Sequence, residues 1–237
     1  MDEPVPETGS TPHPALPRID VTAWVLAGGE GRRMGGIDKG LQTWRRRPLA
    51  QWVMDALRPQ VQGMGISANR NLTRYEQLLA SCLASPMDST DVKHGGPHCL
   101  GTHPDDPDLP ARSGPLAGIL TGLRRSPTDW LQLAACDTPS LPGDLTARLL
   151  SAACASNVDV AVPCTEEASE DGGLQTRPHW TCALLHKRVT PDLAAAFVKG
   201  DRKVGQWIRS QRWVAVSFAP ASDFENMNTL ETLDGRD

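Results

Sequence analysis

The segment VLAGGEGRRMGGIDKGL, residues 25–41, constrains the fold more than any other stretch of the chain. It follows a short apolar run and combines six glycines with Arg32, Arg33 and Lys39. Bare backbone at the end of a strand presents successive N–H groups that can wrap a phosphate chain, and the cationic side chains can neutralise its charge. A flexible connector would not need these three charges, so the segment predicts a site for a phosphorylated ligand.

Two common phosphate-binding patterns do not fit this segment. The dinucleotide pattern G-x-G-x-x-G would begin at Gly29 and Gly31, but Met34 stands where its third glycine belongs. The P-loop pattern requires Gly-Lys-Ser/Thr, whereas Lys39 stands between Asp38 and Gly40. The sequence therefore gives little support to a Rossmann oxidoreductase or to a P-loop ATPase.

The rest of the chain alternates between apolar runs and helical patterns. Strands are predicted at 21–27, 61–70, 129–137, 158–163, 179–187 and 212–219, and helices at 48–60, 74–84, 115–126, 142–156, 191–200 and 203–211. Such alternation predicts an α/β protein whose mainly parallel sheet is covered on both faces. Ligands of these sheets bind at the carboxyl ends of the strands, where both the glycine segment and Asp137 are expected.

The length of 237 residues fits one α/β domain, which we expect to span residues 20–237. Residues 1–19 are acidic and rich in proline, so they predict a disordered tail rather than a signal peptide. Residues 85–113 predict a long loop insertion with at most one short strand. Residues 165–178 predict a polar loop.

Composition excludes several classes of protein. The net charge of −4 argues against broad nucleic-acid binding, and no apolar run approaches the ~20 residues of a membrane span. Six cysteines without a C-x-x-C pair predict free thiols in a reducing cytoplasm. A cluster of possible zinc ligands matches no zinc template in its spacing; it contains His94, His98, Cys99 and His103.

The glycine segment also resembles the signature loop of the molybdenum cofactor guanylyltransferases, the MobA family. The stretches PLAQWVMDAL, SANR, GPLAGILTGL, CDTPSLPGDL and FENMNTLETL follow in the order of that family, and KGDRKVGQWI resembles a stretch of its C-terminal half. The resemblance extends over roughly residues 20–235. It implies a three-layer α/β/α nucleotidyltransferase fold, Rossmann-like, with a mainly parallel sheet.

The resemblance implies transfer of GMP from GTP to the terminal phosphate of molybdopterin. The expected products are molybdopterin guanine dinucleotide and pyrophosphate, with Mg²⁺ as the metal ion and GTP as a substrate. The further partners implied are molybdenum-insertion proteins and apo-molybdoenzymes, in the cytoplasm. The product stays open between a guanylyltransferase, the cytidylyltransferase of the same cofactor and another NTP:phosphate nucleotidyltransferase.

The match to the family loop favours GTP over the alternatives. Loops of the related cytidylyl and sugar-phosphate enzymes tend to read LAAG and lack the pattern MGGxDKGL, which this chain carries. A binding protein without turnover would most simply have lost Lys39 or Asp137, and the sequence retains both.

Carried over position by position, the resemblance assigns roles to individual residues. Lys39, Arg32 and Asp137 are the expected catalytic residues, and Asp137 is the expected Mg²⁺ ligand. The expected nucleotide contacts are Leu26, Ala27, Gly28, Gly29, Gly31, Lys39, Asn69, Asp106 and Asp137. From the residues alone, Asp137 fits a metal ligand or the start of a turn, and Asn69 fits a ligand contact or a turn residue.

Three further assignments depend on looser matches. An aspartate is expected shortly before GPLAG, where Asp105, Asp106 and Asp108 all occur with a spacing one residue longer than the family pattern, and Asp106 is the choice. The expected contacts to molybdopterin or its phosphate are Asn226, Asn228 and Arg202, with Lys203 and the 170–182 segment nearby. Asn228 could equally cap a helix, and Arg202 and Lys203 could belong to a solvated helix start.

Overall fold

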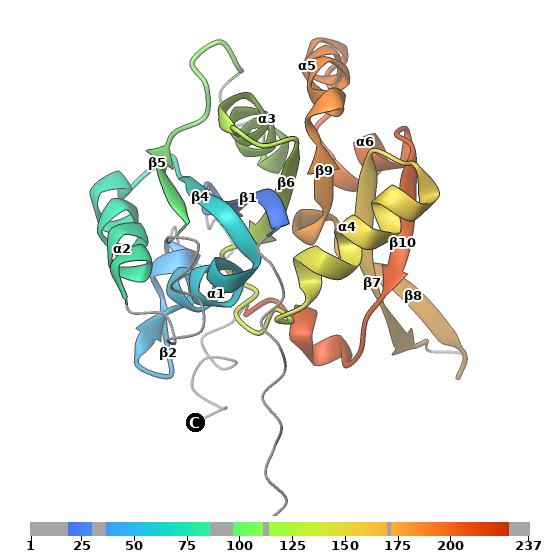
Figure 1. The fold of residues 1–237 in the computed structure, drawn as a ribbon, viewed down its shortest axis with the longest axis horizontal. Coiled ribbons are helices and arrows are strands. Elements are labelled where there is room, and N and C mark those ends of the chain that lie inside the picture. Colours follow the sequence, from blue (N-terminus) through green and yellow to red (C-terminus); the bar gives the residue numbers. More distant parts are fainter. Residues whose placement is uncertain (1–18, 30–36, 86–96, 111–113, 170–171, 228–237) are drawn as a thin grey trace, which may run out of the picture.

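The computed structural model describes residues 19–29, 37–85, 97–110, 114–169 and 172–227. A central sheet has the strand order β10-β7-β9-β6-β1-β4-β5, and β8 pairs with β7 (Figure 1). Its strands are β1 (Ile19–Leu26), β4 (Val61–Ser67), β5 (His98–His103), β6 (Trp130–Ala135), β7 (Val160–Ala168), β8 (Leu174–Pro178), β9 (Leu184–His186) and β10 (Trp213–Ser217). The short strands β2 (Thr43–Trp44) and β3 (Arg47–Pro48) form a separate hairpin.

The sheet is mainly parallel, which confirms the prediction from the alternating pattern. Strand β1 pairs in parallel with β4 and β6, β4 pairs in parallel with β5, and β7 pairs in parallel with β10. Strand β9 runs antiparallel between β6 and β7, and β8 runs antiparallel to β7. The core strands are apolar on both sides because helices cover both faces of such a sheet.

Two apolar cores separate the sheet from its helices, which gives the expected three layers. One core joins the sheet to α1 (Leu49–Leu57), α2 (Leu72–Ala84) and α4 (Leu145–Ser156). The other core joins it to α3 (Pro115–Arg125), α5 (Thr190–Lys199) and α6 (Val204–Arg209). Alternate residues of β1 serve the two cores, since Val25 lies in the first and Trp24 in the second.

Trp24 explains the glycines of two neighbouring elements. Its ring is fully buried, and its Nε1 donates a hydrogen bond of 2.9 Å to the carbonyl of Gly118 in α3. A Cβ atom at Gly65 would lie 2.3 Å from the Trp24 ring, and one at Gly122 would lie 2.6 Å from it. Glycine at both positions therefore allows the large indole to fill the space between β4 and α3.

Two regions differ from the sequence-based prediction. The expected polar loop at 165–178 is in large part a hairpin, in which β7 continues to Ala168 and pairs with β8. The side chains of β8 are mostly exposed, so its sequence lacks the alternation of apolar and polar residues from which a strand is predicted. The expected strand at 179–187 is instead a short 3-10 helix, Trp180–Cys182, followed by β9.

Other expectations fall partly outside the described residues. The 85–113 insertion contains one strand, β5, as expected, while residues 86–96 and 111–113 are not described. The predicted tail, up to residue 18, and the predicted helix after Asn228 also lie outside the described residues.

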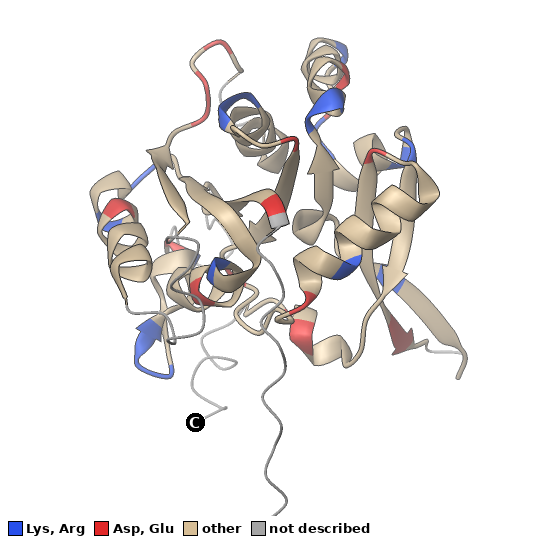
Figure 2. Ribbon diagram, in the orientation of Figure 1, with Lys and Arg blue, Asp and Glu red and all other residues tan. Residues whose placement is uncertain are grey.

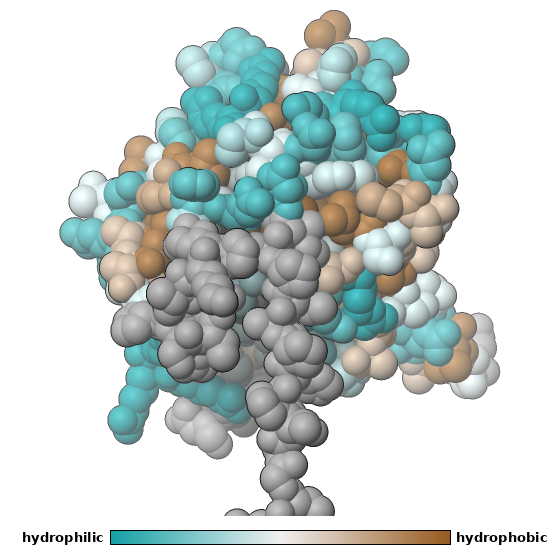
Figure 3. All heavy atoms as spheres, in the orientation of Figure 1, coloured by the Kyte–Doolittle hydropathy of each residue, from teal (hydrophilic) through white to brown (hydrophobic). Residues whose placement is uncertain are grey.

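All six cysteines are free thiols. Within the described part of the chain, no helix has the length and apolar character needed to cross a membrane. Acidic and basic residues are interspersed along the ribbon (Figure 2), and on the face seen in Figure 3 hydrophilic residues cover most of the upper part, with hydrophobic residues in smaller groups among them.

Candidate active site

The carboxyl ends of three central strands meet at one edge of the sheet. The chain leaves β1 toward β4 on one side and returns through β6 on the other, so this edge is a topological switch point. Backbone hydrogen bonds continue past the strand ends, from Ala27 N to Ser67 O at 2.7 Å and from Cys136 N to Leu26 O at 3.1 Å. The start of the glycine segment and the turn at Asp137 therefore lie together, as predicted.

Lys39 and Asp137 form an ion pair at this edge. The Lys39 Nζ atom lies 3.3 Å from Asp137 Oδ2, and 27% and 13% of the respective side chains are exposed. Lys39 begins the 3-10 helix Lys39–Leu41, and Asp137 lies two residues beyond the end of β6. The structure thus brings together two of the three expected catalytic residues, while Arg32 lies outside the described residues.

Asp38 anchors the backbone immediately before Lys39. Its carboxylate accepts hydrogen bonds from the Tyr75 hydroxyl at 2.5 Å and from Asn71 Nδ2 at 2.9 Å. Burial and the neighbouring Asp38 raise the pKa of Tyr75 above its usual value, so the hydroxyl stays protonated and keeps donating. A Cβ atom at Gly40 would lie 2.5 Å from the same hydroxyl, which explains glycine after Lys39.

The segment before the C-terminus closes the other side of the Asp137 turn. Met227 N donates to Asp137 O at 2.8 Å, and Thr138 Oγ1 donates to Asn226 Oδ1 at 2.9 Å. Asn226 therefore lies beside the candidate metal ligand, consistent with its expected place near the site. Asn228, like Gly31, lies outside the described residues.

His179, the residue after β8, supports this segment without adding charge. Its ring stacks on Phe224 at 4.6 Å between centroids, and its Nε2 lies 2.8 Å from Thr165 Oγ1. Burial lowers the pKa of His179 to about 4, so the ring is neutral near pH 7.

Asn69 lies at the end of β4 and faces both the first glycine and an aspartate. A Cβ atom at Gly28 would lie 3.2 Å from Asn69 Nδ2. The same nitrogen donates to Asp105 Oδ2 at 2.8 Å, and Asp105 N donates to Asn69 Oδ1 at 2.9 Å. Burial raises the pKa of Asp105, against the opposing effect of hydrogen bonds from Asn69 and Ser67.

The structure gives Asp105 and Asp106 different partners, and we expect Asp105 rather than Asp106 to contact the nucleotide. The Asp106 carboxylate lies 2.9 Å from Arg124 and 3.1 Å from Arg125, and its backbone N–H donates to Thr121 Oγ1 at 3.1 Å. These contacts commit Asp106 to α3, and Asp108 pairs with Arg124 as well. Asp105 is the aspartate of the three that reaches Asn69.

This difference predicts opposite phenotypes for two neighbouring substitutions. We expect Asp105→Asn to weaken nucleotide binding roughly 10-fold, the effect of one charged hydrogen-bonding group, with little change in stability. We expect Asp106→Asn to leave nucleotide affinity near wild type but to lower the free energy of unfolding by about 2 kcal/mol, because two arginines lose a buried partner. Calorimetric titration measures the nucleotide affinity, and urea unfolding measures the stability. The reverse outcome would assign the nucleotide contact to Asp106 instead of Asp105.

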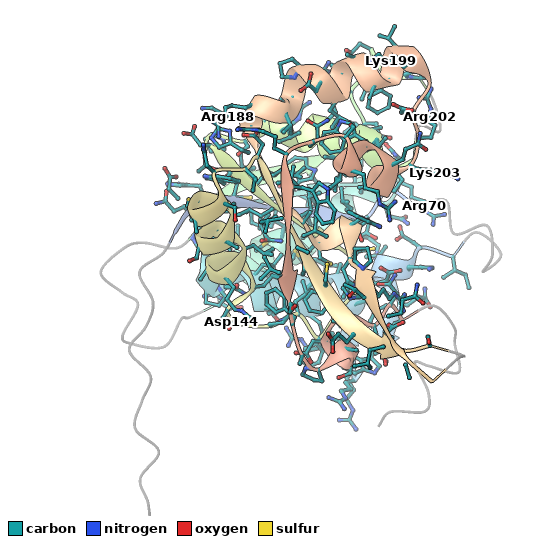
Figure 4. The ribbon with its side chains drawn as sticks, turned by 90° about the vertical axis from the view of Figure 1, so that its right-hand side faces the viewer. Arg70, Asp144, Arg188, Lys199, Arg202 and Lys203 are labelled. Carbon is teal, nitrogen blue, oxygen red and sulfur yellow. The ribbon has the colours of Figure 1, made fainter. Side chains whose placement is uncertain are left out.

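Arg202 and Lys203, the remaining expected contacts to molybdopterin, lie in a separate segment before α6. In Figure 4, Arg202 and Lys203 lie on the same side of the molecule as Arg70, and Asp144 lies on another. A Cβ atom at Gly114, the residue before α3, would lie 3.8 Å from the carbonyl oxygen of Arg202. The start of α6 and the start of α3 are therefore neighbours.

A zinc site finds no support among the described residues, which contain no group of three or more His, Cys, Asp or Glu able to hold a metal ion. His103 instead stacks on Trp24 at 5.9 Å between ring centroids, and its Nε2 lies 2.7 Å from the carbonyl oxygen of Leu100. His94 is not described.

Comparison with known proteins decides the family. Residues 23–216 match the MobA-like NTP transferase domain. The chain belongs to this family. Its membership makes the chain a nucleotidyltransferase and agrees with the fold and with the cationic glycine segment at the sheet edge.

Similar proteins include several relatives from bacteria. A molybdenum cofactor guanylyltransferase of Cupriavidus necator is 41% identical over 92% of this chain and 96% of its own length. A protein of the same name from Ralstonia pickettii is 37% identical over the same shares of the two chains. These relatives align with nearly the whole MobA-like chain.

Solved structures show the same fold at lower identity. The molybdopterin-guanine dinucleotide biosynthesis protein A of Archaeoglobus fulgidus superposes with a TM-score of 0.63 at 19% identity, covering 90% of this chain and 95% of that one. A 2-C-methyl-D-erythritol 4-phosphate cytidylyltransferase of Thermus thermophilus gives 0.57 at 14% identity, covering 91% and 95%. At these identities the likeness concerns the fold of the family.

Proposed function

We propose that the protein transfers GMP from GTP to the terminal phosphate of molybdopterin, forming molybdopterin guanine dinucleotide and releasing pyrophosphate. The observation that carries this proposal is the near full-length similarity to relatives named molybdenum cofactor guanylyltransferase. The structural neighbours include cytidylyltransferases, but they share only the fold, at low identity. Their likeness therefore does not favour CTP as the substrate of this chain.

The chemistry is an in-line displacement at phosphorus. A terminal phosphate oxygen of molybdopterin bonds to the α-phosphorus of GTP, the bond from that phosphorus to the bridging oxygen breaks, and pyrophosphate takes the electron pair. Two anions must be held together, so catalysis depends on positioning and on charge stabilisation. Lys39 supplies a positive charge at the edge of the sheet, and Asn69 and the Leu26–Gly29 backbone line the same edge.

Asp137 fits a magnesium ligand. Mg²⁺ is commonly bound by one or two carboxylates together with substrate phosphates and water, so a single carboxylate at a strand end suits it. The Asp137 side chain is 13% exposed, which leaves it accessible from the edge of the sheet. When bound there, Mg²⁺ would neutralise charge on the phosphates.

We infer that the two substrates bind at different parts of the site. The glycine segment, Lys39 and Asp137 would hold GTP, and Asn226 together with Arg202 would meet the phosphate of molybdopterin. Molybdenum-insertion proteins that supply the cofactor and apo-molybdoenzymes that receive it are the proposed partners. The free thiols of all six cysteines fit a reducing cytoplasm.

Nucleotide binding by calorimetry tests the proposal, with GTP, CTP, ATP and NAD each titrated with and without Mg²⁺. We expect GTP to bind at least about 10-fold more tightly than the others, a difference of about 1.4 kcal/mol, and to bind more tightly with Mg²⁺. Preference for CTP would keep the chemistry and overturn the product. No nucleotide binding at all would contradict the enzyme assignment, and pyrophosphate release that requires molybdopterin would complete the test.

A further inference from the structure

Arg70 occupies a position that connects both flanks of the glycine segment. It follows Asn69 at the end of β4, and its Nη2 lies 3.2 Å from the carbonyl oxygen of Gly29 and 2.9 Å from that of Ile37. Its Nε lies 3.5 Å from Asp38 Oδ2. One guanidinium group therefore contacts the last described residue before the 30–36 stretch and the first two described residues after it.

We propose that Arg70 is a positioning residue that holds the backbone at Gly29 and at Ile37–Asp38 in its binding geometry before the nucleotide arrives. The proposal rests on the proposed function, because it assigns Arg70 to the binding of a nucleoside triphosphate. No phosphate contact by Arg70 is required, since Arg70 acts through the carbonyl groups of Gly29 and Ile37 and through Asp38.

The direction of these hydrogen bonds carries the argument. A carbonyl oxygen facing a phosphate would repel it, whereas an N–H group would bind it. Arg70 turns the carbonyl of Ile37 toward itself, and in a planar trans peptide the N–H of Asp38 then points the opposite way. The guanidinium thereby removes two carbonyl dipoles from the anion site and orients a backbone donor next to Lys39.

Arginine is suited to this task and lysine is not. Guanidinium carries five N–H donors in a rigid plane and can contact several acceptors at once, whereas an ammonium is a compact point charge. Asp38, which is held by Tyr75 and Asn71, fixes the orientation of the Arg70 side chain. The arrangement links the end of β4, the glycine segment and Lys39 into one unit.

The test compares Arg70→Ala, Arg70→Lys and the control Arg74→Ala in the full-length protein. Arg74 is an exposed arginine in the first turn of α2, one turn from Arg70, which makes it a matched control. The first readout is hydrogen exchange of the backbone amides of residues 27–29 and 37–41 without nucleotide. The second is the dissociation constant of GTP, with and without added guanidinium ion.

We expect Arg70→Ala to speed exchange in both segments and to weaken GTP binding roughly 10- to 100-fold, the effect of losing charge-assisted hydrogen bonds. Guanidinium ion is expected to restore part of the affinity, Arg70→Lys to behave much like Arg70→Ala, and Arg74→Ala to match wild type. Melting curves test whether the variants are folded. If Arg70→Ala is unstable, Arg70→Lys, which keeps the charge, takes its place in the comparison with wild type.

Two results would overturn the proposal. Weaker GTP binding with unchanged exchange would make Arg70 a direct phosphate ligand, and unchanged affinity with unchanged exchange would leave it no role. Failure of the wild-type protein to bind GTP would instead count against the proposed function. The exchange measurement would still decide whether Arg70 holds the two flanks.

Discussion

Replacement of Asp137 by alanine is expected to abolish magnesium-dependent transfer while the fold stays intact. The carboxylate lies just beyond β6, paired with Lys39 and beside the Asn226 segment, where it would hold a metal ion that offsets the charge of the GTP phosphates. Loss of such charge stabilisation lowers kcat by a factor of about 10³. Pyrophosphate release at saturating GTP and Mg²⁺ measures the loss.

The same strand offers a matched control for this experiment. Asp129 precedes β6 at its other end, where it forms an exposed ion pair with Lys187. We expect Asp129→Ala to retain wild-type activity, because exposed ion pairs contribute at most about 1 kcal/mol to stability. Near wild-type turnover by the Asp137→Ala variant would show that the metal ligand lies elsewhere.

Replacement of Lys39 by alanine is expected to weaken GTP binding by roughly 100-fold, since a partly buried ammonium group contributes strongly to binding a phosphate chain. The change also leaves the Asp137 carboxylate without its partner at 3.3 Å, so repulsion of the phosphates adds to the loss. The dissociation constant should therefore depend more steeply on Mg²⁺ concentration in the variant. Calorimetric titration of GTP at several Mg²⁺ concentrations measures both effects.

Lys187→Ala is the control for the lysine substitution. It removes the cation of an exposed Lys–Asp pair at the opposite edge of the sheet, where β6 begins and the antiparallel β9 ends. The GTP affinity of this variant should equal that of wild type. Unchanged binding by the Lys39→Ala variant would place the phosphate site away from the Lys39–Leu41 turn and would contradict the proposed use of the glycine segment.

The sheet and its functional edge could be predicted because they depend on patterns that are local in sequence. A strand followed by glycines and a second strand followed by Asp137 must meet at one edge if both belong to a parallel sheet. Their meeting required no knowledge of individual side-chain contacts. The predicted helices follow in the same way from apolar spacing that the two cores then bury.

Contacts that depend on a single residue of register were harder to predict. Asp105 and Asp106 are adjacent, yet the Asp105 side chain hydrogen-bonds with Asn69. The Asp106 side chain instead forms ion pairs with Arg124 and Arg125. Arg70 was missed because two of its partners are backbone carbonyls, which every residue carries. A charged residue directly after Asn69 was the available signal, and it did not distinguish this role from a solvated side chain.

The bond from Met227 N to Asp137 O has a consequence for how the protein is made. Met227 lies 90 residues after Asp137 along the chain, whereas the glycine segment, residues 25–41, precedes both. During synthesis on the ribosome the nucleotide-binding strands emerge first, and the Asp137 turn cannot be closed until Met227 has also emerged. A nascent or truncated chain would therefore contain the phosphate-binding residues without a completed catalytic edge.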